Sequence, residues 1–177
     1  PVAARLQDDF LALAALGQMK LLDEMNERGA FDPRAGKLVV RMGLATGEVN
    51  VGDFGNPPHK SAYTVIGDHV NLAARLESGC KQFGVHMMIS DAMRAKMGDD
   101  IRTRPLGKIV VKGKSEPELV HELIGDRTPK GDATEAWIEA TDSAVSAYID
   151  GDFEKSLREF EDLNVKFGET HLAEIYK

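Results

Sequence analysis

The stretch Y-T-V-I-G-D-H-V-N-L-A-A-R-L-E-S-G-C-K-Q-F, Tyr63–Phe83, decides the fold because it reads as a strand, a turn and a helix in direct succession. Ala62–Ile66 is rich in β-branched and aromatic residues, which is typical of a strand. Gly67 lets the backbone turn, and Asp68 is predicted to be the N-cap of a helix that stops at Gly84. The sequence therefore predicts a strand–turn–helix unit whose helix packs on a sheet.

Helical periodicity gives this predicted helix two faces. The apolar face, expected to pack on the sheet, consists of Val70, Ala73, Leu76, Cys80 and Phe83. The roughly opposite face consists of Asn71, Arg75, Ser78 and Gln82. Asn71 and Arg75 are four residues apart, so an amide and a five-donor guanidinium suited to phosphate project together. Spacing alone favours an ordinary surface pair, because such pairs are common on amphipathic helices, so the functional interpretation depends on the surrounding sequence.

The rest of the first 125 residues predicts an α+β sandwich with a mixed sheet. A helix is expected over 3–27, with an inward face of Leu6, Phe10, Leu13, Leu16, Leu21 and Met25. A strand over 37–44 is expected to pair with an antiparallel neighbour over 48–54, which runs into an exposed loop or arm over 55–60. Further strands are expected over 85–89, 101–105, 108–112 and 118–124, and Ser90 is expected to cap a short helix over 91–97.

The last third of the chain predicts helices. Residues 126–132 have the composition of a linker, which divides the chain into a domain over 1–125 and a helical segment over 133–177. The inward faces are expected to contain Trp137, Thr141, Ala144 and Tyr148, and then Phe153, Leu157, Phe160, Asn164 and Phe167. The pattern A-x6-G-D-F-x2-S-x3-F-x2-L resembles one tetratricopeptide repeat. One repeat cannot bury its own apolar face, so the pair is expected to dock on the preceding domain, on a partner protein or on further repeats.

Composition excludes several classes of function. A chain of 177 residues suits one domain with a small appendage, and no apolar run approaches the roughly 20 residues of a membrane span. A net charge of −7 without a basic block argues against nucleic acid as a partner. Cys80 is the only cysteine, which excludes an internal disulfide and fits a reducing, cytoplasmic compartment.

Three motifs at fixed spacing resemble the class III nucleotidyl cyclases, which comprise adenylate and guanylate cyclases. They are T-G-E-V at 46–49, Y-T-V-I-G-D-x-V-N-L-A-A-R-L-E at 63–77, and P-L-G-K-I-x-V-K-G-K-S-E-P at 105–117. The resemblance covers about residues 1–125 and implies a ferredoxin-like α/β sandwich. It also implies conversion of ATP to 3′,5′-cyclic AMP and pyrophosphate with Mg²⁺ or Mn²⁺. The family works as head-to-tail dimers, in which one protomer supplies metal-binding aspartates and the other supplies Asn and Arg.

The resemblance gives each matching residue a role. Asn71 would hold the ribose, and Arg75 would stabilise the transition state at the α-phosphate. Lys112 would bind the terminal phosphates, with Lys114 as the second choice, although a solvated turn explains both lysines equally. Thr64 stands at the purine-reading position, where many adenylate cyclases have Asp, guanylate cyclases have Cys, and a bacterial adenylate cyclase subgroup has Thr. A hydroxyl can donate or accept, so Thr64 leaves ATP against GTP open, and it also suits an ordinary strand.

The metal site is where the sequence departs from the family. The two metal-binding aspartates and the second purine-reading residue precede the segment that resembles 3–27, and none is found here. Neither Asp53 nor Asp68 stands in their place, and the five histidines are too scattered to form a cluster. Pro1 resembles the proline after the family's metal hairpin, so the chain is interpreted as lacking the N-terminal strands. The exposed sheet is then expected to be covered by another chain or by rearranged elements.

The leading hypothesis is therefore the Asn/Arg half of a dimeric adenylate cyclase site, inactive without the metal-binding half. The alternatives are a guanylate cyclase, a cyclase-like regulatory module that binds nucleotide without turnover, and a helical-repeat scaffold. Asn71, Arg75 and Lys112 together favour the enzyme, because a non-catalytic fold needs none of them.

Overall fold

A computed structural model describes residues 2–29, 36–56, 60–110, 116–126, 132–168 and 170–176, with backbone only for 2–10, 56, 60, 61, 126 and 132. The helices are α1 (Val2–Glu27), α2 (Asp68–Phe83), α3 (Asp91–Arg94), α4 (Asp132–Ile149), α5 (Phe153–Phe167) and α6 (His171–Ile175). The strands are β1 (Met42–Leu44), β2 (Asn50–Asn56), β3 (Lys60–Ile66), β4 (Met87–Ser90), β5 (Ile101–Ile109) and β6 (Glu118–Asp126).

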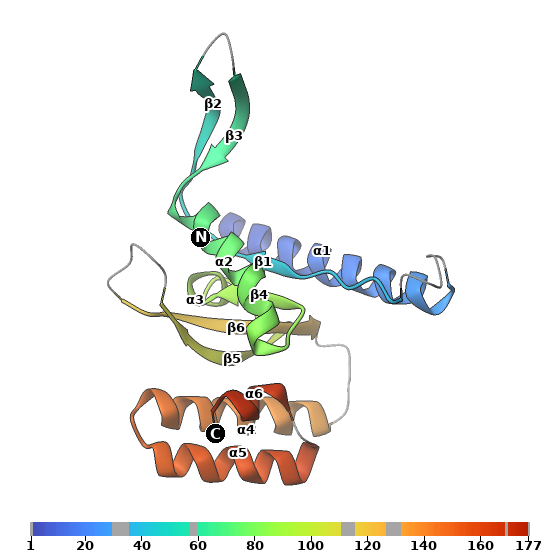
Figure 1. The fold of residues 1–177 in the computed structure, drawn as a ribbon, viewed down its shortest axis with the longest axis vertical. Coiled ribbons are helices and arrows are strands. Elements are labelled where there is room, and N and C mark those ends of the chain that lie inside the picture. The colour runs from blue at the N-terminus through green and yellow to red at the C-terminus, as the bar shows by residue number, and fades with distance from the viewer. Residues whose placement is uncertain are drawn as a thin grey trace.

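Four strands form a mixed sheet in the order β1-β4-β6-β5, in which β1 and β4 are parallel and the other neighbours antiparallel. Strands β2 and β3 form a separate antiparallel hairpin that projects away from the sheet (Figure 1). The predicted α+β fold class is confirmed. Because β1 has no second partner within the described ranges, its outer edge is open there.

The expected pairing of 48–54 with 37–44 was wrong. Only Met42–Leu44 of that segment is a strand, and β2 pairs with β3, so that Thr64 lies opposite Gly52. The A-T-G-E-V connection passes the start of α2, where a Cβ at Gly47 would lie 1.9 Å from the His69 ring. The connection between β1 and β2 is therefore packed against the side chain of His69 on α2.

The expected break between strands 101–105 and 108–112 is also absent, because β5 continues from Ile101 to Ile109. Its pairing with β6 shifts register between Pro105 and Gly107 instead. Proline has no N–H for the ladder, and Gly107 has a φ of 125°, so the irregularity is absorbed as a bulge.

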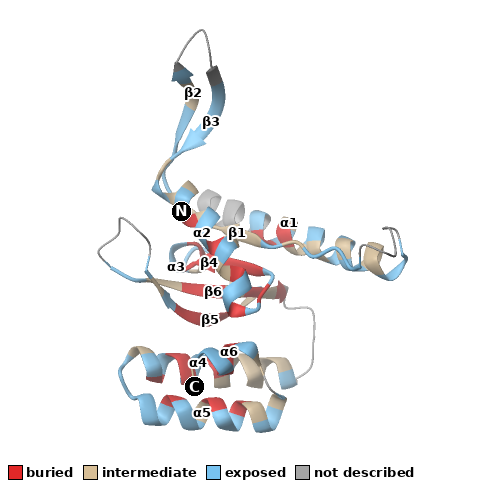
Figure 2. Cartoon of the chain, viewed as in Figure 1, coloured by how far each residue is buried: buried red, intermediate tan, exposed pale blue. Residues whose placement is uncertain are grey.

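The two faces of the sheet carry separate cores (Figure 2). Side chains alternate along β4, so Met88 faces α2 and the C-terminal helices, whereas Met87 and Ile89 face α1 and α3. One core contains Leu72, Leu76, Cys80, Phe83, Leu106, Val120, Phe160, Leu163 and Leu172. The C-terminal helices thus dock on the preceding domain, which was one of the three expected arrangements.

The expected inward face of α1 was wrong at Leu13 and Leu21 and right at Leu16, while the side chains of Leu6 and Phe10 lie outside the described residues. Ala12 and Ala15 are buried, while Leu13 and Leu21 are 48% and 58% exposed. The small alanines let the helix backbone approach Met87 on β4, and Leu16 and Met19 complete that contact. Among the described residues, α1 therefore covers this face of the sheet. The sequence had left open which element or chain would cover it.

The expected inward face of α5 was right at Phe160 and Phe167, but Phe153 is 60% exposed and Ser156, which was not expected there, is buried. The Ser156 hydroxyl donates to the Ala144 carbonyl at 2.8 Å, so a small residue brings the two helices together. The breaks predicted at Gly151–Asp152 and at Gly168 are confirmed, and Asp152 caps α5 by accepting from the Lys155 N–H.

Replacing Arg104 with alanine is expected to lower the free energy of unfolding by about 2 kcal/mol. Arg104 is buried between Glu122, at 2.5 Å, and the Trp137 ring, at 4.0 Å from its centroid. Its loss would leave the Glu122 carboxylate, 19% exposed, without its cation. Urea unfolding measures the change. The control Arg41→Ala, which removes a more exposed pair with Glu77 at 3.7 Å, should cost under about 0.5 kcal/mol; equal losses would contradict this account.

Candidate active site

Helix α2 buries one side and presents the other. Its buried residues are Leu72, Leu76, Cys80 and Phe83, whereas Val70 and Ala73 are only partly buried. The buried face of α2 therefore differs from the expected one, because it includes Leu72, whereas Val70 and Ala73 lie at its edge. Asn71, Arg75, Ser78 and Gln82 are all exposed, as predicted. The amide and the guanidinium are thus free of the core and open to a ligand.

The start of α2 differs from the prediction at Asp68. Gly67 holds the N-cap position with a φ of 156° and gives no side-chain cap, and Asp68 is the first helical residue. Its carboxylate lies in the first turn, where the helix dipole favours negative charge. The Asn71 N–H donates to the Gly67 carbonyl at 3.2 Å, so Asn71 belongs to the first turn.

Close contact with β1 fixes α2 over the sheet. A Cβ at Gly43 would lie 2.1 Å from the Ala73 carbonyl oxygen and 2.3 Å from the Glu77 nitrogen. Only glycine lets the strand and the helix backbone approach this closely. Sequence reasoning missed this positioning role of Gly43, although a glycine inside a predicted buried strand is the signal that would have indicated it.

The end of α2 agrees with the prediction. Gly84 adopts a left-handed φ of 66°, and its N–H donates to the Cys80 carbonyl. Burial raises the pKa of the Cys80 thiol to about 11, so the thiol stays protonated near neutral pH and is core, as expected.

The other predicted site residues lie on different elements. Thr64 is exposed on β3, three residues before the Gly67 turn into α2. Lys112 and Lys114 lie outside the described residues, in the connection between β5 and β6. Their roles and that of Thr64 stay predictions.

A cavity of about 660 Å³ lies at the base of the hairpin, lined by Glu48, Val49, Asn50, Gly67, Asp68 and His69. The carboxylates of Glu48 and Asp68 would repel a triphosphate. The buried Nδ1 of His69 has no hydrogen-bond partner within the described part of the chain. Because of the two carboxylates, this cavity is less suited to bind phosphate than the exposed face of α2.

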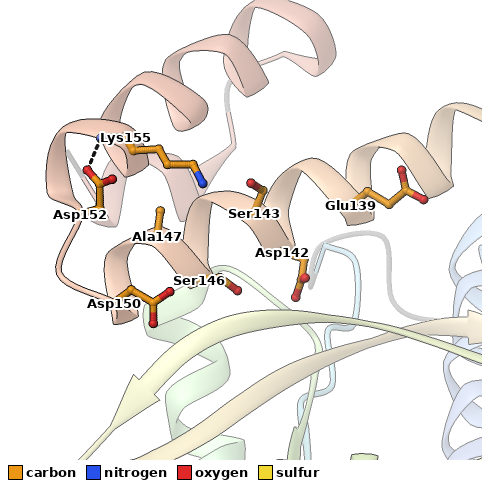
Figure 3. Close-up of a pocket in the computed structure, with 8 residues that line it drawn as sticks. All are labelled: Glu139, Asp142, Ser143, Ser146, Ala147, Asp150, Asp152 and Lys155. Carbon is orange, nitrogen blue, oxygen red and sulfur yellow. Dashed lines mark hydrogen bonds between the residues drawn. The ribbon is translucent and has the colours of Figure 1, made fainter.

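A second cavity, of about 440 Å³, lies between α4 and α5 (Figure 3). Its lining carries four carboxylates, from Glu139, Asp142, Asp150 and Asp152, and a single cation, from Lys155. This excess of negative charge is unfavourable for a nucleotide and excludes the cavity as a triphosphate site.

In the ranges for which side chains are described, no group of three or more His, Cys, Asp or Glu residues is placed to hold a metal ion. The described side chains therefore do not fit the divalent metal on which the cyclase family generally depends. In the same ranges, no helix is long and apolar enough to cross a membrane.

The fold and the α2 face define a mixed α+β domain that presents an amide and a guanidinium beside a projecting hairpin. Residues 3–125 match the model of the family described as "Adenylate and Guanylate cyclase catalytic domain", and the chain belongs to this family. The described helices α4 to α6 lie beyond the matched residues.

Relatives support this membership. The chain is 38% identical over 127 residues to "Adenylate cyclase 1" of Rhizobium meliloti, across 71% of this chain and 18% of that protein. It is 32% identical over 130 residues to a terminal-differentiation-specific adenylate cyclase of Dictyostelium discoideum, across 71% of this chain and 6% of that protein. The chain therefore spans less than a fifth of either relative.

Solved structures agree on the fold. The crystal structure of the adenylyl cyclase CyaB from P. aeruginosa superposes with a TM-score of 0.50 at 33% identity, over 67% of this chain and 57% of that one. The guanylyl cyclase Cya2 superposes with a TM-score of 0.54 at 23% identity, over 72% of this chain and 62% of that one, and supports the fold alone.

Proposed function

We propose that this chain is part of an adenylate cyclase that converts ATP to 3′,5′-cyclic AMP and pyrophosphate. The observation that carries the proposal is the exposed Asn71–Arg75 pair on α2, within a chain of the cyclase catalytic domain family. Relatives called adenylate cyclases match over most of residues 1–125 and favour ATP over GTP. Thr64 suits either purine, so its role in reading adenine is part of the proposal.

The proposed reaction forms one bond and breaks one. The ribose 3′-hydroxyl gives its proton to water as its oxygen attacks the α-phosphorus, and the bond from the α-phosphorus to the bridging oxygen breaks to release pyrophosphate. Asn71 holds the ribose in line, and Arg75 compensates the negative charge that develops on the α-phosphate. Lys112 holds the terminal phosphates. Such catalysis is mostly positioning and electrostatics, which these residue types supply.

The site is proposed to be shared with a second cyclase protomer, arranged head to tail. Mg²⁺ or Mn²⁺ would be bound outside the described residues, because these provide no metal site. The β2–β3 hairpin supports an interface: Val51, Tyr63 and Val65 are exposed on it, Tyr63 by 74% (Figure 2). A lone two-stranded hairpin is marginally stable in water, so a partner that covers these apolar side chains would stabilise it.

The division into a cyclase domain over 1–125, a linker over 126–132 and a tetratricopeptide-like segment over 133–177 is part of the same proposal. The helices α4 and α5 share a core with the sheet, so we propose that the segment is anchored to the cyclase domain and leaves its outer surface for a protein partner.

Assay of the full-length protein with Mn-ATP and with Mn-GTP tests the proposed function. We expect cyclic AMP and pyrophosphate in equal amounts from ATP, and at least about tenfold lower kcat/KM with GTP, the discrimination that hydrogen bonds to a base edge supply. A preference for GTP would make the protein a guanylate cyclase. Nucleotide binding without any cyclic product would instead support a regulatory module and overturn the proposal.

A further inference from the structure

The C-terminal segment 170–176 touches two elements of the proposed site, although it lies beyond the family match at 3–125. Helix α2, which carries Asn71 and Arg75, ends beside α6 (Figure 1). Strand β5 is contacted by Tyr176 and leads into the connection that contains Lys112. Both contacts are made to backbone carbonyls, so they act on the position of the elements themselves.

The first contact caps the end of α2. His171 donates from Nε2 to the Gln82 carbonyl at 2.9 Å, in the last helical turn, where carbonyls lack an intrahelical partner. The other ring nitrogen, Nδ1, lies 3.2 Å from a Glu174 carboxylate oxygen. A Cβ at Gly84 would lie 2.8 Å from the His171 ring, so the glycine that ends α2 also makes room for this histidine.

The second contact holds the bulge of β5. The Tyr176 hydroxyl donates to the Leu106 carbonyl at 2.7 Å and occupies the space that a Cβ at Gly107 would need, 1.9 Å away. The ring stacks on Phe160 with 4.8 Å between centroids, and Tyr148 meets it edge-on. Burial raises the pKa of Tyr176 to about 12, so the hydroxyl stays a donor near neutral pH.

The start of the segment, residues 170–173, is itself held in place by hydrogen bonds and by burial. The Thr170 hydroxyl accepts from the Ala173 N–H at 3.2 Å, and the Thr170 N–H donates to the Asn164 side chain of α5 at 3.2 Å. Leu172 is buried in the core that contains Cys80 and Phe83 of α2. The C-terminal segment is thus packed against the buried side of α2, the helix that carries Asn71 and Arg75.

We propose that His171 and Tyr176 are positioning residues for the cyclase reaction, which fix the end of α2 and the bulge of β5 from outside the family domain. This inference rests on the proposed function. Arg75 is exposed on α2 and would contact the α-phosphate from there. A small tilt of α2 would move the guanidinium away from the negative charge that develops on this phosphate. Such a misplacement of a catalytic group costs up to about a hundredfold in rate. The C-terminal helices are then required for turnover.

The test compares Tyr176→Phe and His171→Ala with Ser156→Ala in the full-length protein. Ser156→Ala removes the same kind of bond as Tyr176→Phe, a hydroxyl donating to a carbonyl, but within the α4–α5 pair and away from α2 and β5. We expect about tenfold lower kcat, with the KM for ATP within about twofold, for Tyr176→Phe and His171→Ala. Ser156→Ala should keep kcat. His171→Gln, which restores an N–H donor, should recover part of the loss.

A second readout does not depend on turnover. Hydrogen exchange of the amides at Gly84 and Val85, which donate to the Cys80 carbonyl at the end of α2, should be faster in His171→Ala than in Ser156→Ala. Unaltered kcat in an active protein, or equal losses in all variants, would overturn the inference. A full-length wild-type protein without cyclase activity would contradict the proposed function instead. The hydrogen-exchange measurement would then test by itself whether His171 holds the end of α2.

Discussion

Replacing Arg75 with alanine is expected to lower kcat at least about a hundredfold, the cost of losing a charge that stabilises only the transition state. The side chain is exposed on α2, whereas the helix packs on the core through Leu72 and Leu76, so its removal should leave folding intact. Arg75→Lys should recover only part of the activity, because an ammonium lacks the planar fork of donors that matches a phosphate.

The matched control for Arg75 is Lys81→Ala, which removes another exposed cation from the same helix. It should change kcat by less than about twofold, because screening weakens the effect of a distant surface charge. Initial rates with Mn-ATP and thermal unfolding of both variants give the comparison. Full activity in Arg75→Ala would remove Arg75 from the mechanism.

Replacing Gly43 with alanine is expected to lower the free energy of unfolding by about 3 kcal/mol or more, and kcat by about a hundredfold. The new Cβ would lie 2.1 Å from the Ala73 carbonyl oxygen and 2.3 Å from the Glu77 nitrogen. Both are backbone atoms of α2 and cannot rotate away, so the helix must lift from β1 and carry Arg75 with it.

The control for Gly43 is Gly79→Ala, on α2 itself. A Cβ there would meet the end of the Met88 side chain at 3.5 Å, an ordinary contact, so stability should be unchanged or rise by up to about 1 kcal/mol. Urea unfolding and kcat are measured for both variants. A Gly43→Ala protein that is as stable and as active as Gly79→Ala would show that close β1–α2 packing does not position the site.

The strand–Gly–helix unit and the exposed face of Asn71 and Arg75 could be predicted because both depend on local signals. Gly84 ends the helix through its own backbone preference, and the 3.6-residue period separates polar from apolar faces. Ser90 caps α3 by accepting from the Met93 N–H, which is again a contact within one turn.

What depended on tertiary contact could not be predicted. Strand β2 pairs with β3 rather than β1, and Gly47, which precedes β2, packs on His69, a contact between residues far apart in the sequence. The inward faces of α1 and α5 are set by small residues, Ala12, Ala15 and Ser156, which periodicity ranks below leucine and phenylalanine. Likewise, no local pattern indicated that His171 would cap α2 or that Tyr176 would reach β5.

Complementation tests the shared site most directly. The full-length protein carrying Arg75→Ala should lose at least about a hundredfold in kcat, because both sites of the proposed dimer lack the guanidinium. We expect residues 1–177 by themselves to be inactive, because the two metal-binding aspartates that the family resemblance implies are not found in this sequence. Mixing the two should restore cyclic AMP formation from Mn-ATP, and residues 1–177 carrying Arg75→Ala should restore none. A mixture as inactive as its components, although the two chains associate, would contradict a site completed by Asn71 and Arg75 of this chain.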